Sequence, residues 1–286
     1  MTTMAATVAN VRRVLKDRPE IAQLDGALGD TTTESFNVSA TDAVKFAAGN
    51  VWEHDDNTGE RRYIKSVTGL VVVGTRGYDG STADAHSDDT YLVKDPRFPY
   101  NEITQAVNTV LYIGLFNAGV YDVVNHQITV SADTIAYTAP TASCEEFLWV
   151  YQRINSIDSP TPIWDFTRLP RLVDTTLWAN GRVFEISGGT AGTTYYVNCK
   201  HKLTLDRLST AQEQVVLFLA SAHLLEWEEP HRTSGPTNQG DRTVKPGQNA
   251  QMAAYYRAQA KELIAKERAY LRALNPPFRN YRRSRF

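Results

Sequence analysis

The sequence has few cysteines and no long apolar run, and each shortage narrows the class of protein. Only two cysteines, Cys144 and Cys199, occur among the 286 residues. They lie far apart in the chain and outside any CxxC spacing, which argues against a disulfide framework or a structural zinc site and favours buried, reduced thiols. No apolar run approaches the roughly 18 residues of a membrane-spanning helix, and the first residues lack a secretion signal's apolar stretch and cleavage site. We therefore expect a soluble protein with no membrane contact.

Motifs of common catalytic and nucleotide-binding sites are also missing. The chain contains no GxxxxGK[ST], no GxGxxG after a strand, no HExxH and no GxSxG pattern. One segment, DAHSDD, places Asp84, His86, Asp88 and Asp89 close together, and hard or borderline cations bind such oxygen and imidazole ligands. A solvated turn is the preferred interpretation, both here and for His54 with the two aspartates after it; a metal-dependent hydrolase is the alternative. We therefore expect a non-enzymatic protein that binds no cofactor or metal.

Charge is unevenly distributed along the chain, although the net charge is only −2. Residues 1–143 hold 11 basic and 18 acidic side chains, a net charge of −7, whereas residues 144–286 hold 19 and 14, a net charge of +5. Opposite patches of this kind steer stacked or head-to-tail association of copies. A dedicated nucleic-acid-binding protein would have a larger and broader basic excess. The charge pattern therefore favours assembly over DNA recognition.

The first 120 residues alternate between helical and strand-like patterns. Apolar residues recur at helical spacing from about Val8 to Lys16, which predicts a short amphipathic helix. Pro99 begins a second amphipathic helix that continues to about residue 116. Between them the polar stretch HDDNTGE is typical of a hairpin connection. Short β-rich runs predict a small barrel or sandwich; they lie at about residues 35–39, 50–54, 61–67, 70–76 and 90–94.

A second β-rich region follows, and the chain then returns to helical patterns. Asn180-Gly181 predicts a type I′ hairpin within this region, and its aromatic-rich runs are typical of an antiparallel sandwich. Thr210 and Glu213 have the spacing of a capping box, which predicts a helix as far as Pro230. A last helix is predicted from about residue 248 to 275. The candidate strands lie at about residues 127–131, 134–138, 146–153, 163–169, 173–179, 182–187 and 194–203.

These patterns together predict an α+β protein. Its helical core is made of an N-terminal helix, a central helix and a C-terminal pair of long helices, and it carries two antiparallel β insertions, a small barrel and then a β-sandwich. An extended C-terminal tail follows. The expected segments are residues 1–30 (N-terminal helical segment of the core), 31–95 (small β-barrel), 96–120 (central core helix), 121–205 (β-sandwich), 206–275 (C-terminal helical core) and 276–286 (docking tail).

The C-terminal tail combines arginines with aromatic residues after the last predicted helix. Such side chains are typical of interface anchors, whereas four arginines on one copy neutralise about four phosphates, too few for tight binding to a duplex. Weak contacts of this kind become effective when many copies act together. We predict a docking segment, with a disordered solubilising tail as the alternative. Its candidate residues are Phe278, Arg279, Tyr281, Arg282, Arg283, Arg285 and Phe286.

The polar segment between the last two predicted helices, residues 231–247, is longer than a helical hairpin requires. Loops of that size are usually functional or mobile. We predict that it takes part in assembly. Its candidate residues are His231, Arg232, Asp241, Arg242 and Lys245.

Two stretches of the chain carry recognisable combinations of motifs. The first, residues 67–108, has an RGY-x-G-[ST] turn (RGYDGS), a histidine in a small-residue loop (ADAHSDD), an exit strand and a DPR-[FW]-P entry (DPRFP) to an amphipathic helix. The second consists of LFLASAHLLEWEEPHR, the polar loop and AYYRAQAKELIAKERAYLRAL. The first stretch resembles a pattern in the neck proteins of tailed bacteriophages, and the second is similar to the helical portion of their head-to-tail connector (adaptor) proteins. The region 121–205 matches no such pattern.

This resemblance implies a structural virion protein of the neck, at the portal vertex, present in the host cytoplasm before assembly. The expected form is a homo-oligomeric ring, usually of twelve copies, beneath the portal. The expected partners are the portal protein and a stopper or tail-terminator protein, and genomic DNA passes through the lumen without sequence readout. C-terminal extensions of such adaptors commonly grip the portal, so residues 276–286 are expected to dock there.

A carbohydrate- or host-surface-binding β module of a phage tail is the alternative function. It is suggested by the aromatic residues of the second β region, among them Trp149, Tyr151, Trp164 and Trp178. Aromatic residues in strands more often fill a core than form a sugar-binding platform. The adaptor is therefore the preferred hypothesis.

Overall fold

The structure is a computed structural model of the chain. The chain forms two compact units, which we call unit 1 (Met1–Val110 with Leu208–Leu263) and unit 2 (Leu111–Arg207 with the residues from Ile264). Every helix in the described part of the chain is too short or too polar to cross a membrane. The described residues are 3–17, 19–56, 58–129, 136–138, 144–152, 161–162, 166–168, 183–186, 191–228, 237–239, 242–244 and 247–274.

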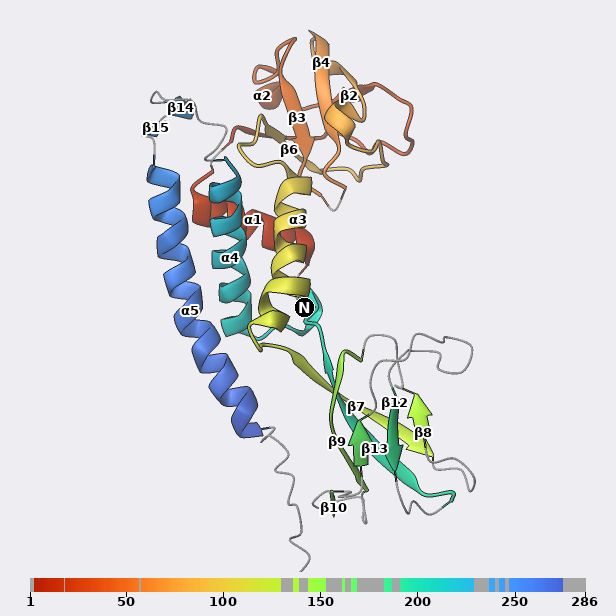
Figure 1. Cartoon of the computed structure of the whole chain (residues 1–286). Coiled ribbons are helices and arrows are strands. Elements are labelled where there is room, and N and C mark those ends of the chain that lie inside the picture. Colours follow the sequence, from red (N-terminus) through yellow and green to blue (C-terminus); the bar gives the residue numbers. More distant parts are fainter. Residues whose placement is uncertain are drawn as a thin grey trace, which may run out of the picture. The chain divides into compact units, whose positions relative to one another are not determined.

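Unit 1 combines helices with antiparallel strands (Figure 1). The predicted N-terminal, central and C-terminal helices are all present, which together with the sheets confirms the α+β class. In chain order the elements of unit 1 are α1 (Met4–Leu15), β1 (Ile21–Gln23), β2 (Ser35–Asn37), α2 (Ala40–Ala43), β3 (Val51–His54), β4 (Arg61–Thr68), β5 (Val71–Thr75), the 3-10 turn η1 (Tyr78–Gly80), β6 (Tyr91–Lys94), α3 (Tyr100–Thr109), α4 (Thr210–Glu228), β14 (Thr237–Gln239), β15 (Arg242–Val244) and the first part of α5 (Gln248–Leu274).

The helices of unit 1 pack through the apolar stripes that the sequence predicts. α1, α3 and α4 lie against one another, and Ile103 and Val107 of α3 are fully buried. α5 joins them through Tyr256, whose ring stacks on Phe218 at a centroid distance of 5.9 Å. The Tyr256 hydroxyl also donates a hydrogen bond to the carbonyl oxygen of Val14 (3.0 Å). A single aromatic residue of α5 therefore contacts both α4 and α1.

Six of the strands form one antiparallel sheet in the order β1-β6-β3-β4-β5-β2. Its two edges meet only at an isolated bridge between Leu24 and Val38, where the Asp25 N–H donates to the Asn37 carbonyl oxygen (2.9 Å). The sheet is therefore open, and the predicted closed barrel is wrong. The physical reason is length, because β1 and β2 have only three residues each and cannot form a full ladder.

One face of this sheet carries an apolar core that also contains charged groups. Trp52 stacks on Phe46 at a centroid distance of 4.1 Å, and Ile64 is fully buried beside them. Residues that face each other in an antiparallel pair lie on the same side of a sheet. Because Trp52 pairs with Arg62, and residues alternate along a strand, Arg62 and His54 belong to this inner face. Both are completely buried.

Unit 2 contains two further antiparallel sheets, in the orders β10-β9-β13-β7 and β11-β12-β8. Six of the seven predicted strands of this region coincide with described strands. The run at 173–179 and the Asn180-Gly181 turn lie outside the described residues, and packing of the two sheets as a sandwich stays a prediction. The elements are the π-helical turn η2 (Val110–Leu115), which follows α3 directly, β7 (Asp122–Thr129), β8 (Ala136–Thr138), β9 (Glu146–Gln152), β10 (Thr161–Pro162), β11 (Phe166–Arg168), β12 (Val183–Ile186), β13 (Thr194–His201), the 3-10 turn η3 (Leu205–Arg207) and the end of α5.

Candidate functional site

The arginine of the RGYDGS motif anchors a loop of unit 1. Arg76 binds Glu60 with two parallel hydrogen bonds, Nε to Oε1 (2.9 Å) and Nη2 to Oε2 (2.7 Å), and also donates to the carbonyl oxygens of Asp30 and Asp84. The following Gly77 has a φ of +61°, and a Cβ there would come within 3.0 Å of the Ser81 carbonyl oxygen. A side chain at Gly77 would therefore be strained, so the motif needs its glycine for a structural reason.

His86 lies between two carboxylates in the same cluster. Its Nδ1 is 2.5 Å from Asp56 Oδ2 and its Nε2 is 2.7 Å from Glu60 Oε2, and only 3% of the residue is exposed. Burial alone would lower the pKa of His86, but the hydrogen bonds to Asp56 and Glu60 outweigh it and raise the pKa above 6.5. An imidazolium donates from both ring nitrogens, so the geometry suits the charged form.

His54 takes the opposite protonation state. Its ring stacks on His86 at a centroid distance of 3.5 Å and an interplanar angle of 1°. Its Nε2 accepts a hydrogen bond from Arg62 Nε (2.9 Å), and since a guanidinium only donates, His54 is neutral with its proton on Nδ1. Burial, together with the charge of His86, holds the pKa of His54 well below 6.5. No partner for this Nδ1 occurs among the described residues.

The solvated-turn interpretation of these two histidines is therefore wrong. His54 ends strand β3 and His86 forms an isolated bridge with Leu28, so both are held inside the sheet domain. Asp84 and Asp88 are exposed, as expected for a turn, and Asp88 accepts a hydrogen bond from the Gly26 N–H (2.7 Å). The partners of His86 come from 26 and 30 residues away in the chain, a pairing that local spacing does not reveal.

The same cluster is poorly suited to a metal. His54, Asp56 and His86 place ligand atoms within 4.8 Å of one another. However, both nitrogens of His86 already contact carboxylates, and His54 Nε2 faces the buried guanidinium of Arg62, whose positive charge would oppose a cation. Asp84, and Asp88 or Asp89, which the hydrolase alternative requires beside His86, are not part of this group. The residue set of that alternative is therefore not assembled.

The DPRFP motif connects the sheet to the helices. Arg97 donates to Glu228 Oε1 (3.2 Å) at the end of α4 and to Asn249 Oδ1 (3.2 Å) at the start of α5, and its guanidinium lies 4.8 Å from the centroid of the Phe98 ring. Phe98 is buried, and Pro99 supplies the N-cap of α3. Each residue from Arg97 to Pro99 therefore has a role in holding secondary structure together.

Glu53 of β3 also connects the sheet to the helices. It lies on the face of the strand opposite to Trp52 and His54. Its two carboxylate oxygens accept the first backbone N–H of α3, at Tyr100 (3.0 and 2.9 Å), and one also pairs with Arg12 of α1. Arg12 reaches Asp55 as well (2.7 Å). Glu53 has no exposed surface. One buried carboxylate thus links two helices to the sheet, and it lies where the positive end of the α3 dipole favours a negative charge. We call the residues Arg12, Glu53, Arg97, Glu228 and Asn249 the junction.

A second cluster of ligand-type side chains lies in unit 2. His126 of β7 and His201 of β13 have their Nε2 atoms 3.1 Å apart, and Cys199 lies beside them with all ligand atoms within 4.8 Å. The neighbouring thiol of Cys144, together with burial, raises the pKa of Cys199. Burial also lowers the pKa of both histidines. The two cysteines are buried and reduced, as predicted, but they are neighbours in space despite their distance in sequence.

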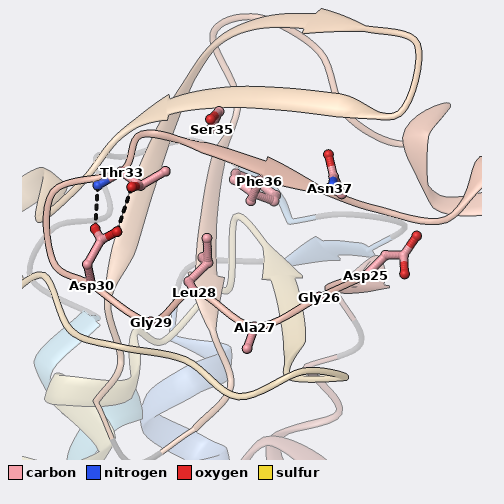
Figure 2. Close-up of a pocket in the computed structure, with 10 residues that line it drawn as sticks. All are labelled: Asp25, Gly26, Ala27, Leu28, Gly29, Asp30, Thr33, Ser35, Phe36 and Asn37. Atoms are coloured by element: carbon pink, nitrogen blue, oxygen red, sulfur yellow. Dashed lines mark hydrogen bonds between the residues drawn. The ribbon is translucent and has the colours of Figure 1, made fainter.

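Figure 2 shows a pocket of about 310 Å³ between the loop that follows β1 and strand β2. Asp30, at its rim, accepts hydrogen bonds from the Thr33 N–H and hydroxyl (2.6 Å each), so its carboxylate closes its own loop. The lining contains no buried charged side chain, and its buried members are Leu28 and Phe36. The pocket therefore lacks the convergent polar groups that a specific ligand site needs.

The predicted docking and assembly residues lie almost entirely outside the described residues. Of the loop set, Arg242 alone has a described backbone, in a hairpin in which β14 pairs with β15, so the predicted loop is in part a hairpin. Of the four aromatic residues that suggested a carbohydrate-binding module, Trp149 and Tyr151 have a described backbone but no described side chain. The residues outside the described part are Phe278, Arg279, Tyr281, Arg282, Arg283, Arg285, Phe286, His231, Arg232, Asp241, Lys245, Trp164 and Trp178.

Comparison with known proteins adds little. No protein-family model matches the chain, and no curated protein matches it. Among solved structures, the chain is similar to one from a structure described as "Neck of empty GTA particle computed with C6 symmetry", with 11% sequence identity over 55% of this chain and 75% of that chain. The TM-score is 0.22, too low to support a conclusion about fold or function.

Proposed function

We propose that this chain is a non-enzymatic adaptor of the phage neck that forms a ring beneath the portal and joins the capsid to the tail. The observation that carries the proposal is the structural role of the motifs on which the resemblance rests. RGYDGS, the buried His86 and DPRFP are separate in sequence. In unit 1 they build one sheet domain and fasten it to the helices, through the Arg76–Glu60–His86 cluster and through Arg97 of the junction.

A structural role agrees with the chemistry of these motif residues. Arg76, His86 and Arg97 are each engaged by groups of the same unit, so their charges serve folding and are not presented to a substrate. Catalytic groups in contrast need access to a reacting atom. A shared pattern of interlocked structural residues therefore favours a scaffold protein over an enzyme.

The exposed apolar surface of unit 1 is consistent with contacts to neighbouring copies. Leu70 and Val71, which are adjacent at the β4–β5 hairpin, are 46% and 40% exposed. Large exposed apolar side chains that occur together often mark protein contacts. In a closed ring each copy presents such a surface to the next, which is the association that the polarised charge of the chain also favours.

The carbohydrate-binding alternative gains no support, because the aromatic side chains that suggested it lie outside the described side chains. The adaptor proposal therefore stays the first choice, with the portal protein, a stopper or tail terminator and passing DNA as its partners. Residues 276–286 are proposed to dock on portal subunits. Docking would order this segment at a conformational cost, so its aromatic residues must become buried in the complex.

The proposal is tested by mixing the purified full chain with the portal protein of the same phage and imaging the particles by negative-stain electron microscopy. We expect rings stacked on the portal. A chain that lacks residues 276–286 should keep the thermal stability of the full chain and lose portal binding, and high salt should weaken the full-length complex. A chain that stays monomeric at all concentrations, with and without portal, would contradict the proposal. Unfolding of the truncated chain would contradict the docking role of the tail.

A further inference from the structure

The four sulfur and imidazole side chains of unit 2 come together through strand pairing. β13 pairs with β7 on one side and with β9 on the other, so its Cys199 and His201 lie between the two neighbouring strands. His126 belongs to β7. Cys144 lies two residues before β9, and the intervening Glu145 N–H donates to the Lys200 carbonyl oxygen (2.8 Å). The cluster thus draws on all three of these adjacent chain segments.

The register explains how residues distant in sequence share one face. Cys199 pairs with Val124, and His126 pairs with Val197, so Cys199 and His126 lie on the same side of the sheet. His201 follows Cys199 by two residues and therefore points to that side as well. The β-bulge between Asn198 and Cys199 shifts the pairing with β9 at this point. Bulges re-aim side chains locally and are often found next to functional sites.

The composition and spacing of the cluster match a zinc-class site. Two cysteines and two histidines are the ligand set of many structural zinc sites, which are tetrahedral and closed. With Zn–N bonds of about 2.0 Å, two nitrogens on one tetrahedral ion lie about 3.3 Å apart, and the Nε2 atoms of His126 and His201 are 3.1 Å apart. Cys144 and Cys199 have no exposed surface, and His201 is 9% exposed. The ligand atoms of His126, Cys199 and His201 lie within 4.8 Å of one another, and His126 is half-buried whereas the other two are buried. Cys144, whose thiol neighbours that of Cys199, is the candidate for the fourth ligand.

A plain hydrogen-bonded cluster is the competing explanation. In that case one imidazole donates its Nε2 proton to the other, and the two thiols are paired with each other. This arrangement buries four polar groups with only weak S–H bonds for the sulfurs. The cluster also differs from the His54–His86 pair of unit 1, in which a buried guanidinium contacts the histidine and carboxylates occupy the nitrogens. In unit 2, by contrast, the ligand atoms of His126, Cys199 and His201 lie within 4.8 Å of one another.

We propose that Cys144, Cys199, His126 and His201 form a tetrahedral site for a zinc-class divalent cation that fastens the start of β9 to β13 and β7. The ion takes the place of the two thiol protons, which are released to solvent, while the imidazole proton on Nε2 moves to Nδ1 of the same ring, so that both histidines bind as neutral ligands. Its role is structural, because four protein ligands leave no position for a substrate. This inference rests on unit 2 alone and does not depend on the adaptor function.

The test uses cobalt(II) as a spectroscopic substitute for zinc in the full chain, purified with a chelator and a non-thiol reductant. We expect one equivalent of cobalt to produce thiolate-to-cobalt charge-transfer absorption and strong visible bands of tetrahedral geometry. Equimolar zinc should bleach them. Since the chain has only two cysteines, the charge-transfer band reports on Cys144 and Cys199 alone. Zinc should also raise the unfolding temperature of the full chain, whereas magnesium should not.

Single substitutions assign the ligands. Cys199→Ser should abolish the tetrahedral spectrum, and His126→Gln should weaken cobalt binding at least about tenfold, because changes even outside the ligand shell of metal sites cost that much. His223→Gln in α4, also at a half-buried histidine, is the matched control and should leave binding unchanged. If Cys199→Ser fails to fold, the His126→Gln variant and the cobalt titration of the wild-type chain decide whether the proposed site binds metal. No charge-transfer band from folded, reduced protein, or a band indifferent to His126→Gln, would overturn the proposal.

Discussion

Single residues of unit 1 hold opposite protonation states side by side. His86 is charged between Asp56 and Glu60, and the stacked His54 is neutral against Arg62. Two histidines in contact cannot both carry a charge at low cost inside a protein. Their different partners decide which one does. The stability of unit 1 should therefore depend on pH in two directions.

The His86→Gln variant tests how the stability of unit 1 changes above pH 6.5. The folded-state pKa of His86 is raised above 6.5, so the stability it contributes is fully present below pH 6.5 and is lost as the pH rises through the folded value. At about pH 6 we expect the variant to lose about 2–3 kcal/mol of unfolding free energy, since a buried carboxylate loses its charged partner. The loss should shrink towards pH 9. Urea unfolding across this range measures it, and a pH-independent difference would contradict the charged state of His86.

His54 controls how the stability of unit 1 changes below pH 6.5. Its folded-state pKa is depressed, so protons bind more readily to the unfolded chain, and its contribution is lost as the pH falls below 6.5. Wild-type stability should therefore pass through a maximum near the shared unfolded value of 6.5. Asp56 and Glu60 add to the decline once the pH falls below their unfolded values of 3.8 and 4.5, because hydrogen bonds from Arg76 and His86 hold the pKa of Glu60 low despite burial, and His86 does the same for Asp56.

Glu53 allows a second residue-level prediction, about the junction. Glu53→Gln removes the charge that Arg12 and the α3 N-terminus share, and we expect a loss of about 2–4 kcal/mol in urea unfolding because a buried cation is left with a weaker partner. Glu20→Gln is the matched control. Glu20 is 42% exposed at its side chain and pairs with Lys94, so its loss should cost less than about 1 kcal/mol. Equal effects of the two substitutions would contradict the special role of the junction.

At the scale of elements, the sequence pattern was most reliable where apolar periodicity was strong. The helices α1, α3, α4 and α5 and the strands β3, β4 and β5 follow directly from it, since the periodicity of the side chains decides which face is buried. The four-residue helix α2 was not predicted. β1 was not predicted, because three residues carry too little alternation. Whether a sheet closes depends on edge contacts across distant residues, which periodicity does not encode. The predicted barrel failed for that reason.

The capping box at the start of α4 differs by one residue from the one that the sequence predicts. The spacing of Thr210 and Glu213 predicts a capping box, but in the structure the box is one residue earlier. Ser209 Oγ accepts the Gln212 N–H (3.2 Å), and Gln212 Oε1 accepts the Ser209 N–H (3.0 Å). The segment STAQE satisfies the pattern in both registers. Gln212 is buried, which agrees with the register in which Ser209 and Gln212 form the capping box.

Two alanine substitutions distinguish these registers. Ser209→Ala should cost about 1 kcal/mol, the usual value of a lost N-cap, and lower the unfolding midpoint by about 2–4 °C. Thr210→Ala, at an exposed first-turn position, should change stability by less than about 0.5 kcal/mol. Differential scanning fluorimetry measures both. The reverse order would restore the register predicted from sequence.

At the scale of the whole molecule, the chain comprises two compact units, each of which contains buried apolar residues. The candidate clusters of both units were beyond sequence reasoning for a common reason. His86 meets carboxylates brought by the β3–β4 hairpin, and Cys144 meets Cys199 through pairing of β9 with β13. The alternation that places Arg62 with Ile64 on the inner face of β4 was the one available signal of buried charge.

Two compact units should unfold in two steps in calorimetry, because a chain made of more than one compact unit need not unfold in a single two-state transition. We expect His86→Gln to lower the transition of unit 1 alone, and removal of zinc by a chelator to lower the transition of unit 2 alone. A comparison of both perturbations on the full chain provides the measurement. A single transition moved equally by both would show that the units unfold as one.

The wide sequence separation of the His86 contacts has a kinetic consequence. His86 reaches Asp56 and Glu60 across 30 and 26 residues, so the ion cluster can close only after the intervening strands have found their places. It should be absent from the rate-limiting transition state. Weakening it would then accelerate unfolding while leaving the refolding rate almost unchanged. The cluster therefore slows the unfolding of the completed sheet and takes no part in the folding nucleus.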